Sequence, residues 1–273
     1  NGFKVTVTDM QGNGYIIETS KKNTVYRSSV LVMPAVTLGE PDIPAGESMP
    51  DYIDENGISQ GRGIGIDGVI WAPVNCGYHE TDYPYGKLYQ WGRKYGQGYS
   101  GYDYNVSKEV SDAAVPEIMT GGVPLEQGQS EENADLFFLG YRGNDYDWLY
   151  SSDDTLWNSG TESEPLKTEY DPCPDGWRVP TYAELDELSK NKSSLTTNDK
   201  QQTGYWLSGQ SSYTSSVPQV FFPAAGDRSG YDGNAYSRGR YGHYWASGSS
   251  DYDDYISIGF GDNTFSRGSG HVG

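Results

Sequence analysis

The sequence has few cysteines and histidines, half as many basic as acidic residues, and no long apolar run. No stretch approaches the roughly 18 consecutive apolar residues that a membrane-spanning helix needs. Two cysteines and three histidines, with no CxxC pair or Cys/His cluster, argue against a zinc site. The 38 acidic residues against 19 basic ones give a net charge of −19, which repels phosphate backbones and anionic lipid. The sequence therefore predicts no nucleic-acid partner and no membrane insertion.

Glycine and tyrosine are abundant. The 273 residues include 36 Gly, 14 Pro, 24 Tyr and 7 Trp, while the apolar fraction is 35%. Tyrosine and tryptophan can supply the burial that aliphatic side chains usually provide. Many glycines and prolines, with hardly any helical periodicity, predict a loop-rich fold in which strands dominate.

The first part of the chain alternates polar and apolar residues. Strands are expected at 3–8 and 15–19, with a third apolar run at 28–38. Three strands are too few for a separate core, so residues 1–38 are interpreted as the last strands of a β-sandwich or as a small sheet docked on the second unit of the chain. Residues 39–65 are acidic, contain three prolines, and are expected to form a semi-extended linker.

The second unit is expected to span residues 66–273. Thr181 and Glu184 form a capping box that predicts a helix over 181–191. The apolar spacing over 85–95 predicts a shorter helix that closes at the following glycine. Residues 97–170 are interpreted as a surface insertion pinned by the isolated aromatics Phe137, Phe138, Trp148 and Trp157. Strands are predicted at 66–75, 204–207, 217–222, 241–247 and 255–260.

The last segment has a different composition. After Gly226 there is no Leu, Lys, Glu, Gln, Pro, Met or Cys, and the chain is mostly Tyr, Ser, Asp, Gly, Arg and Asn. Binding surfaces use this set, because Tyr gives stiff contact area while Ser, Gly and Asn give adaptable hydrogen bonds. A disordered tail can share much of this composition. Disordered segments are poor in aromatics, however, whereas this segment is rich in them and alternates with period two over 255–260. We expect an ordered, ligand-facing segment.

Three motifs occur in order along residues 66–273. They are WAPVN at 71–75 with YGKLYQWG at 85–92, CPDGWRVPTYAE at 173–184, and FPAAG at 222–226 with YWAS at 244–247. Together they resemble the "major paralogous" domain family of Bacteroidetes and Fibrobacter surface proteins. The chain is also similar to the variable proteins of diversity-generating retroelements, whose binding site is filled by Tyr, Asp, Ser, Asn, Gly, Arg and His. Residues 1–38 resemble the end of a fimbrillin-type β-sandwich.

The resemblance implies an α+β fold over residues 66–273, similar to the C-type lectin and formylglycine-generating enzyme folds. In that fold the final segment builds the ligand surface. The implied ligand-binding residues are Arg238, Arg240, Tyr241, His243, Asp251, Tyr252, Asp254, Tyr255, Ser257, Asp262 and Asn263. The alternative for each residue is an ordinary solvated position in a loop.

Cys76 and Cys173 leave two alternatives open. An even number of cysteines is consistent with one disulfide in an exported protein, and two buried free thiols are the other interpretation. Members of the resembled family finish with a further strand that carries an Arg-Cys-Val sequence. This chain reaches Gly273 without it, so the usual partner of Cys173 is missing and Cys76 takes its place in the disulfide interpretation.

Metal and catalytic sites have weaker support. Residues 251–254 with Asp262 and Asn263 offer oxygen ligands for calcium, but the sugar-binding tripeptides of calcium-dependent lectins do not accompany them. No GxSxG elbow or Gly-rich phosphate loop occurs. Formylglycine-generating relatives need cysteines late in the domain, and none follows Cys173.

We therefore expect a non-enzymatic receptor or adhesin without a cofactor, exported to a bacterial cell surface or pilus. The chain opens at Asn1 rather than Met, which predicts a mature or trimmed form from which an export signal is gone. The expected partner is a protein or glycan on another cell or phage, with other surface or pilus subunits as neighbours. The alternatives are a carbohydrate-binding adhesin of fixed specificity and, with less support, an enzyme of the formylglycine-generating type.

Overall fold

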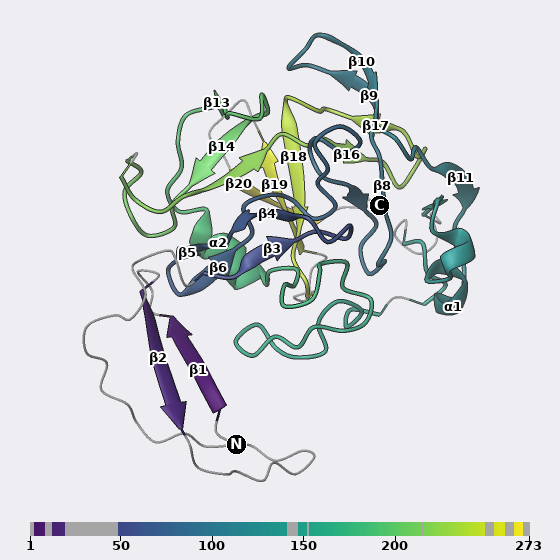
Figure 1. Ribbon diagram of the computed structural model, residues 1–273. Coiled ribbons are helices and arrows are strands. Elements are labelled where there is room, and N and C mark those ends of the chain that lie inside the picture. The colour runs from purple at the N-terminus through teal and green to yellow at the C-terminus, as the bar shows by residue number, and fades with distance from the viewer. Residues whose placement is uncertain are drawn as a thin grey trace.

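The computed structural model describes residues 3–8, 13–19, 49–140, 147–151, 153–214, 216–248, 254–259 and 265–269. Strands hold 34% of the described residues and helices 7%. The described strands pair in small sheets of two or three (Figure 1). The described helical segments are α1 (Leu125–Gly128), α2 (Tyr182–Leu188) and the 3₁₀ turn η1 (Glu131–Asn133).

The α+β, C-type-lectin-like architecture expected over residues 66–273 is wrong. The chain is mostly β, its sheets are small and mainly antiparallel, and its helices are too few and too short to form a layer. The physical reason is that turns interrupt the chain so often that no strand in the described residues exceeds six residues.

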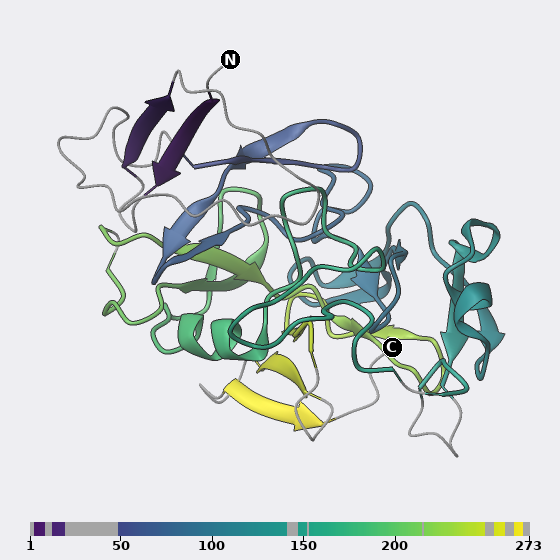
Figure 2. The same cartoon turned by 90° about the horizontal axis from the view of Figure 1, so that it is seen from below.

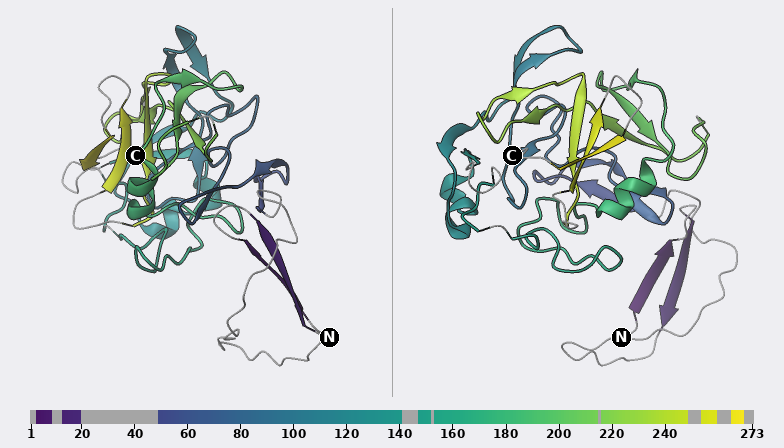
Figure 3. Two further views of the ribbon diagram at one scale, coloured as in Figure 1. Left: turned by 90° about the vertical axis from the view of Figure 1, so that its left-hand side faces the viewer. Right: turned by 180° about the vertical axis from the view of Figure 1, so that it is seen from behind.

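The N-terminal residues form an antiparallel hairpin. Strand β1 (Phe3–Thr8) pairs with β2 (Gly14–Thr19) in register from Phe3 opposite Thr19 to Thr8 opposite Gly14. The hairpin stands apart from the rest of the molecule (Figure 3). These two strands match the sequence prediction, while the apolar run at 28–38 lies outside the described residues.

The expected linker over 39–65 is folded where the structure describes it, from residue 49 on. Four short strands form two antiparallel pairs, β3 (Asp51–Ile53) with β4 (Ser59–Arg62), and β5 (Ile64–Ile66) with β6 (Val69–Trp71). Tyr52 is 2% exposed, and its ring lies 5.3 Å from that of Trp177. The single strand predicted over 66–75 is instead a hairpin, because Asp67 and Gly68 both take positive φ, as a two-residue turn requires.

The helix predicted over 85–95 does not form. The segment contains β7 (Leu88–Tyr89), paired with β8 (Gly96–Gln97). Gly86 and Gly92 have φ of +85° and +79°, conformations outside the helical region. These two turns reverse the chain where helical spacing of the aromatics favours a helix.

The aromatics of the 97–170 segment are buried as predicted, since Phe137, Phe138, Trp148 and Trp157 are at most 3% exposed. Phe138 and Trp148 form a core cluster with Val123, Leu149 and Leu156, which we call the second core. The strands of the 97–170 segment are β9 (Ser100–Asp103), β10 (Lys108–Ser111), β11 (Glu117–Thr120) and β12 (Leu136–Leu139), and β11 runs parallel to β12. Of these strands, β12 contributes residues to the second core.

Arg93 lies in the middle of this second core and is fully buried. Its guanidinium donates to the carbonyl oxygens of Gly128, Leu136 and Asn133 at 2.9, 2.6 and 3.0 Å. It also lies 4.9 Å from the ring centroid of Phe138. Carbonyl groups therefore take the place of water around this cation, as burial of a charge requires.

The first core packs helix α2 against a three-stranded sheet. Thr181 caps α2 and forms the predicted capping box with Glu184, which confirms the helix, although it ends at Leu188 instead of Asn191. The sheet contains β13 (Thr196–Thr197), β14 (Thr203–Leu207) and β15 (Val220–Pro223). Buried residues of this core include Trp71, Leu185, Leu207 and Phe222.

Two of the final strands, β18 (Tyr241–Trp245) and β19 (Asp254–Gly259), confirm the strands predicted at 241–247 and 255–260. The sequence did not predict the other three, β16 (Asp227–Arg228), β17 (Ala235–Tyr236) and β20 (Phe265–Ser269). Strands β18, β19 and β20 form one antiparallel sheet, and β19 lies beside α2 (Figure 2).

Candidate functional site

Arg238 was expected to face a ligand, and the structure corrects this prediction. The residue is 1% exposed. Its guanidinium donates two hydrogen bonds of 2.7 Å to the two carboxylate oxygens of Asp112, and it lies 4.1 Å from the ring centroid of Tyr99 and 4.8 Å from that of Tyr85. A charge this deeply buried needs such a partner, so Arg238 anchors this part of the chain to Asp112 in the interior of the protein.

The turn at 237–241, which contains Arg238, is tightly constrained. The amides of Arg240 and Tyr241 both donate to the carbonyl oxygen of Ser237 at 2.9 Å, and the amide of Gly239 donates to Ala224 at 2.8 Å. Gly239 has φ of +76°, and a Cβ there would lie 2.4 Å from the backbone nitrogen of Asn105. The turn is therefore pressed directly against the neighbouring β9–β10 hairpin.

Arg240, two positions after the buried Arg238, is exposed. Its guanidinium lies 5.6 Å from the ring centroid of Tyr104 and 5.1 Å from that of Tyr241. Tyr104 in turn contacts Tyr102 edge-on at 4.9 Å. Arg240, Tyr102 and Tyr104 are exposed, whereas Tyr241 is partly buried and packs against the first core. The three exposed residues are of the aromatic and Arg type that dominates binding surfaces.

The sheet register brings several other predicted positions together. In the backbone ladder, Tyr241 lies opposite Gly259, His243 opposite Ser257, and Trp245 opposite Tyr255. Paired residues of an antiparallel ladder share one face of the sheet. The predicted positions 241, 243, 255 and 257 thus lie on the same face, which we call the β18–β19 face.

The other predicted residues are not brought to this face. Asp254 opposes Ser269 on the ladder and alternates with Tyr255, so it belongs to the opposite face. The calcium ligands and contact residues Asp251, Tyr252, Asp262 and Asn263 lie outside the described residues. Within the part of the chain that the structure describes, no group of three or more His, Cys, Asp and Glu residues could hold a metal ion.

A cavity of about 490 Å³ opens beside the β18–β19 face, and His243 and Trp245 line it. Much of its wall is aromatic and comes from several segments, including Trp71, Tyr89 and Trp177. Its volume is in the range of small-ligand sites, which are mainly apolar with a few polar groups.

Burial shifts the pKa values of two titratable groups in the cavity wall. Desolvation lowers the pKa of His243 to about 4 and raises the pKa of Asp227 to about 6, because both environments disfavour the charged form. His243 is thus neutral at pH 7, whereas Asp227 is a carboxylate that lacks full solvation. Titratable groups shifted in this way mark a cavity as a candidate site.

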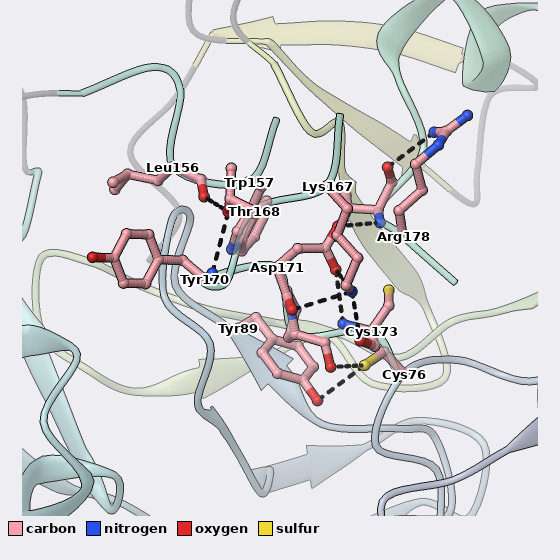
Figure 4. A network of polar contacts seen from close by, with 12 residues as sticks. Cys76, Tyr89, Leu156, Trp157, Lys167, Thr168, Tyr170, Asp171, Cys173 and Arg178 are labelled. Carbon is pink, nitrogen blue, oxygen red and sulfur yellow. Dashed lines mark hydrogen bonds and ion pairs between the residues drawn. The ribbon is translucent and has the colours of Figure 1, made fainter. Parts of the chain in front are cut away.

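One wall of the cavity is held by a polar network around Asp171 (Figure 4). Lys167 donates to the Asp171 carboxylate at 2.9 Å and to the carbonyl oxygen of Cys173 at 2.6 Å. Asp171 also accepts hydrogen bonds of 2.8 Å from the backbone amides of Cys173 and Val179. This buried carboxylate fixes the path of the 171–179 segment along the cavity.

Cys76 and Cys173 meet in this wall as free thiols. The Cys76 Sγ donates to the carbonyl oxygen of Pro172 at 3.3 Å and lies 3.3 Å from the Tyr89 hydroxyl. The neighbouring Cys173 thiol lowers the pKa of Cys76, and the neighbouring Cys76 thiol, together with burial, raises the pKa of Cys173. The disulfide interpretation therefore joins two neighbouring side chains, which are free thiols in this structure.

Sequence reasoning missed Asp227, Tyr102 and Tyr104. The YSGYDY sequence at 99–104 has the same residue types as the last segment, so its composition was a usable signal. Nothing in the sequence distinguished Asp227 from the many other acidic residues, because its distinction is the cavity beside it.

Comparison with known proteins assigns no family to this chain. No family model matches the sequence, and no curated protein or solved structure matches it either. In the ranges that the structure describes, no helix is long and apolar enough to cross a membrane.

Proposed function

We propose that this protein binds a ligand without transforming it, and that its site is the β18–β19 face with the adjoining cavity. The observation that carries the proposal is the backbone register. It gathers four positions singled out from composition onto one face, and one of them, His243, lines the cavity together with Trp245.

The surroundings of this face support a recognition role. The buried pair between Arg238 and Asp112 fixes the turn that leads into β18, so exposed side chains next to it can be presented without reordering the backbone. Rigid presentation reduces the entropy lost on binding. Arg240 with its tyrosine neighbours extends the site onto the open surface. That the ligand is a protein or glycan of another cell stays a prediction.

A pair of tyrosine variants tests the proposal. Tyr255→Ala changes the β18–β19 face, whereas Tyr150→Ala removes a tyrosine that is 72% exposed and lies in the segment after the second-core strand β12. Glycan and protein arrays probed with the wild-type chain would first identify a bound component. We expect Tyr255→Ala to weaken that binding at least about tenfold, as truncation of an aromatic hot spot does, and Tyr150→Ala to leave it unchanged.

A stability control completes this experiment. Both variants should melt within a few degrees of the wild type, so that lost binding is not lost folding. Equal binding by wild type and Tyr255→Ala would contradict the assignment of the site.

A further inference from the structure

The cavity beside the β18–β19 face has three basic side chains in its wall, and each already has acceptors. Lys87 donates to Glu55 at 2.6 Å. Arg178 donates to both carboxylate oxygens of Glu184. These two ion pairs leave neither cation available for an anionic ligand.

The third basic residue, Arg228, is held by backbone. It is 4% exposed and donates to the carbonyl oxygens of Gly98 and Gly233 at 2.6 Å each. Its neighbour Asp227 differs from every other charged group of the cavity wall. Within the described part of the chain, the Asp227 carboxylate accepts no hydrogen bond and forms no ion pair, although it is only partly exposed.

The position of Asp227 in the sheet places it beside His243. Gly226 and Gly242 form a parallel bridge, so the residues immediately after them, Asp227 and His243, are directed to the same side. Both border the cavity. His243 is uncharged at neutral pH and therefore does not neutralise the carboxylate.

The remaining wall favours positive charge with an apolar body. Trp71, Tyr89, Trp177 and Trp245 all line the cavity, and the faces of such rings attract cations. The chain as a whole carries a net charge of −19, which raises the local concentration of cations and repels anions. A neutral ligand would leave Asp227 buried without a partner, and an anion would be repelled by it.

We propose that the cavity binds a small organic cation, a primary or quaternary amine on an aromatic or aliphatic body, with its ammonium group against the Asp227 carboxylate and its body among the aromatic rings. This inference rests on the proposed function, since it names the ligand class of the same site.

Calorimetric titration with three probes of one shape tests it. Phenethylammonium, 2-phenylethanol and 3-phenylpropionate share the phenyl body and differ in charge. With the wild-type protein at low salt we expect the cation to bind at least about tenfold more tightly than the neutral alcohol, as a partly desolvated charge pair gives. We expect no binding of the anion.

A matched pair of variants locates the effect. Asp227→Asn keeps the side-chain shape and should bring the ratio of cation to alcohol affinity close to one. Asp135→Asn removes the same charge from an exposed position before β12, away from the cavity wall, and should keep the wild-type ratio. A melting curve checks that each variant is folded, and the wild-type ratio is decisive even if Asp227→Asn does not fold.

The outcomes separate the two proposals. Equal affinity for cation and alcohol, binding of none of the probes, or an unchanged ratio in Asp227→Asn would overturn the ligand class. The array experiment with Tyr255→Ala is independent of these probes, so the assignment of the binding face would stand or fall on that experiment alone.

Discussion

Arg238 and Arg240 lie two positions apart and have opposite environments. Arg238 is buried against Asp112 and two aromatic rings, while Arg240 is exposed above Tyr104. Composition alone treats the two residues alike, because the partner of Arg238 is 126 positions away in the chain. The candidate site could be predicted as a segment, but which of its side chains face outward depends on contacts that the sequence does not display.

Substitution of each arginine tests this division. Arg238→Ala leaves the Asp112 carboxylate buried without its partner, so we expect a loss of roughly 3–5 kcal/mol in the free energy of unfolding. Arg240→Ala removes an exposed side chain and should change stability by no more than about 0.5 kcal/mol. Urea unfolding of both variants measures this difference, and equal losses would contradict the buried role of Arg238.

Among the elements, those with local signals were predictable. Helix α2 has its capping box, and β14, β15, β18 and β19 coincide with apolar runs or period-two alternation. The helix expected over 85–95 failed because Gly86 and Gly92 adopt positive φ and the aromatics there pack against distant segments. Trp91, for example, donates to the carbonyl oxygen of Ala246 at 3.2 Å. Non-local contacts of this kind also hid the strands from residue 49 on.

The 171–179 segment allows a test of the cysteine pair. Oxidised glutathione should convert the thiols of Cys76 and Cys173 to a disulfide. The two hydrogens of the thiols leave in two molecules of reduced glutathione, so the protein mass falls by two hydrogens. Because the bond closes a loop of about a hundred residues, we expect stability to rise by roughly 2–4 kcal/mol. Intact-mass measurement and urea unfolding with and without reductant report the two effects.

The control for the cysteine experiment is Cys76→Ser under the same treatment, which should show neither the mass change nor the gain in stability. A wild-type mass that stays unchanged, or that grows by an attached glutathione, would contradict an intramolecular bond.

The described part of the molecule has two core clusters, and they differ in the groups that compensate their charged side chains. The second core surrounds Arg93 with carbonyl groups, which do not titrate, whereas the first core and the cavity depend on several carboxylates. The pH dependence of stability should therefore reflect the cavity side of the molecule.

Asp227 and His243 oppose each other in that dependence. The folded-state pKa of Asp227 is raised to about 6, so its contribution is present at low pH and is lost as pH rises from about 4 to 6. The folded-state pKa of His243 is lowered to about 4, so its contribution grows as pH rises from about 4 to 6.5.

Asp227→Asn should remove one side of this balance. At pH 7 we expect the variant to be more stable than the wild type by about 1–3 kcal/mol, because a shift of one pKa unit corresponds to about 1.4 kcal/mol. The advantage should disappear near pH 4. Urea unfolding of both proteins between pH 4 and pH 7 measures this difference in stability. A difference that does not change with pH would show that burial does not raise the pKa of Asp227.

The turn at 237–241 also determines where the gene can change without harm. A Cβ at position 239 would clash with the backbone of Asn105, and Arg238 is buried, so substitutions at these two positions disturb the scaffold. Arg240, by contrast, is exposed to solvent, and its guanidinium contacts the rings of Tyr104 and Tyr241. A lineage under pressure to acquire new partners could therefore rewrite position 240 repeatedly while inheriting the same scaffold.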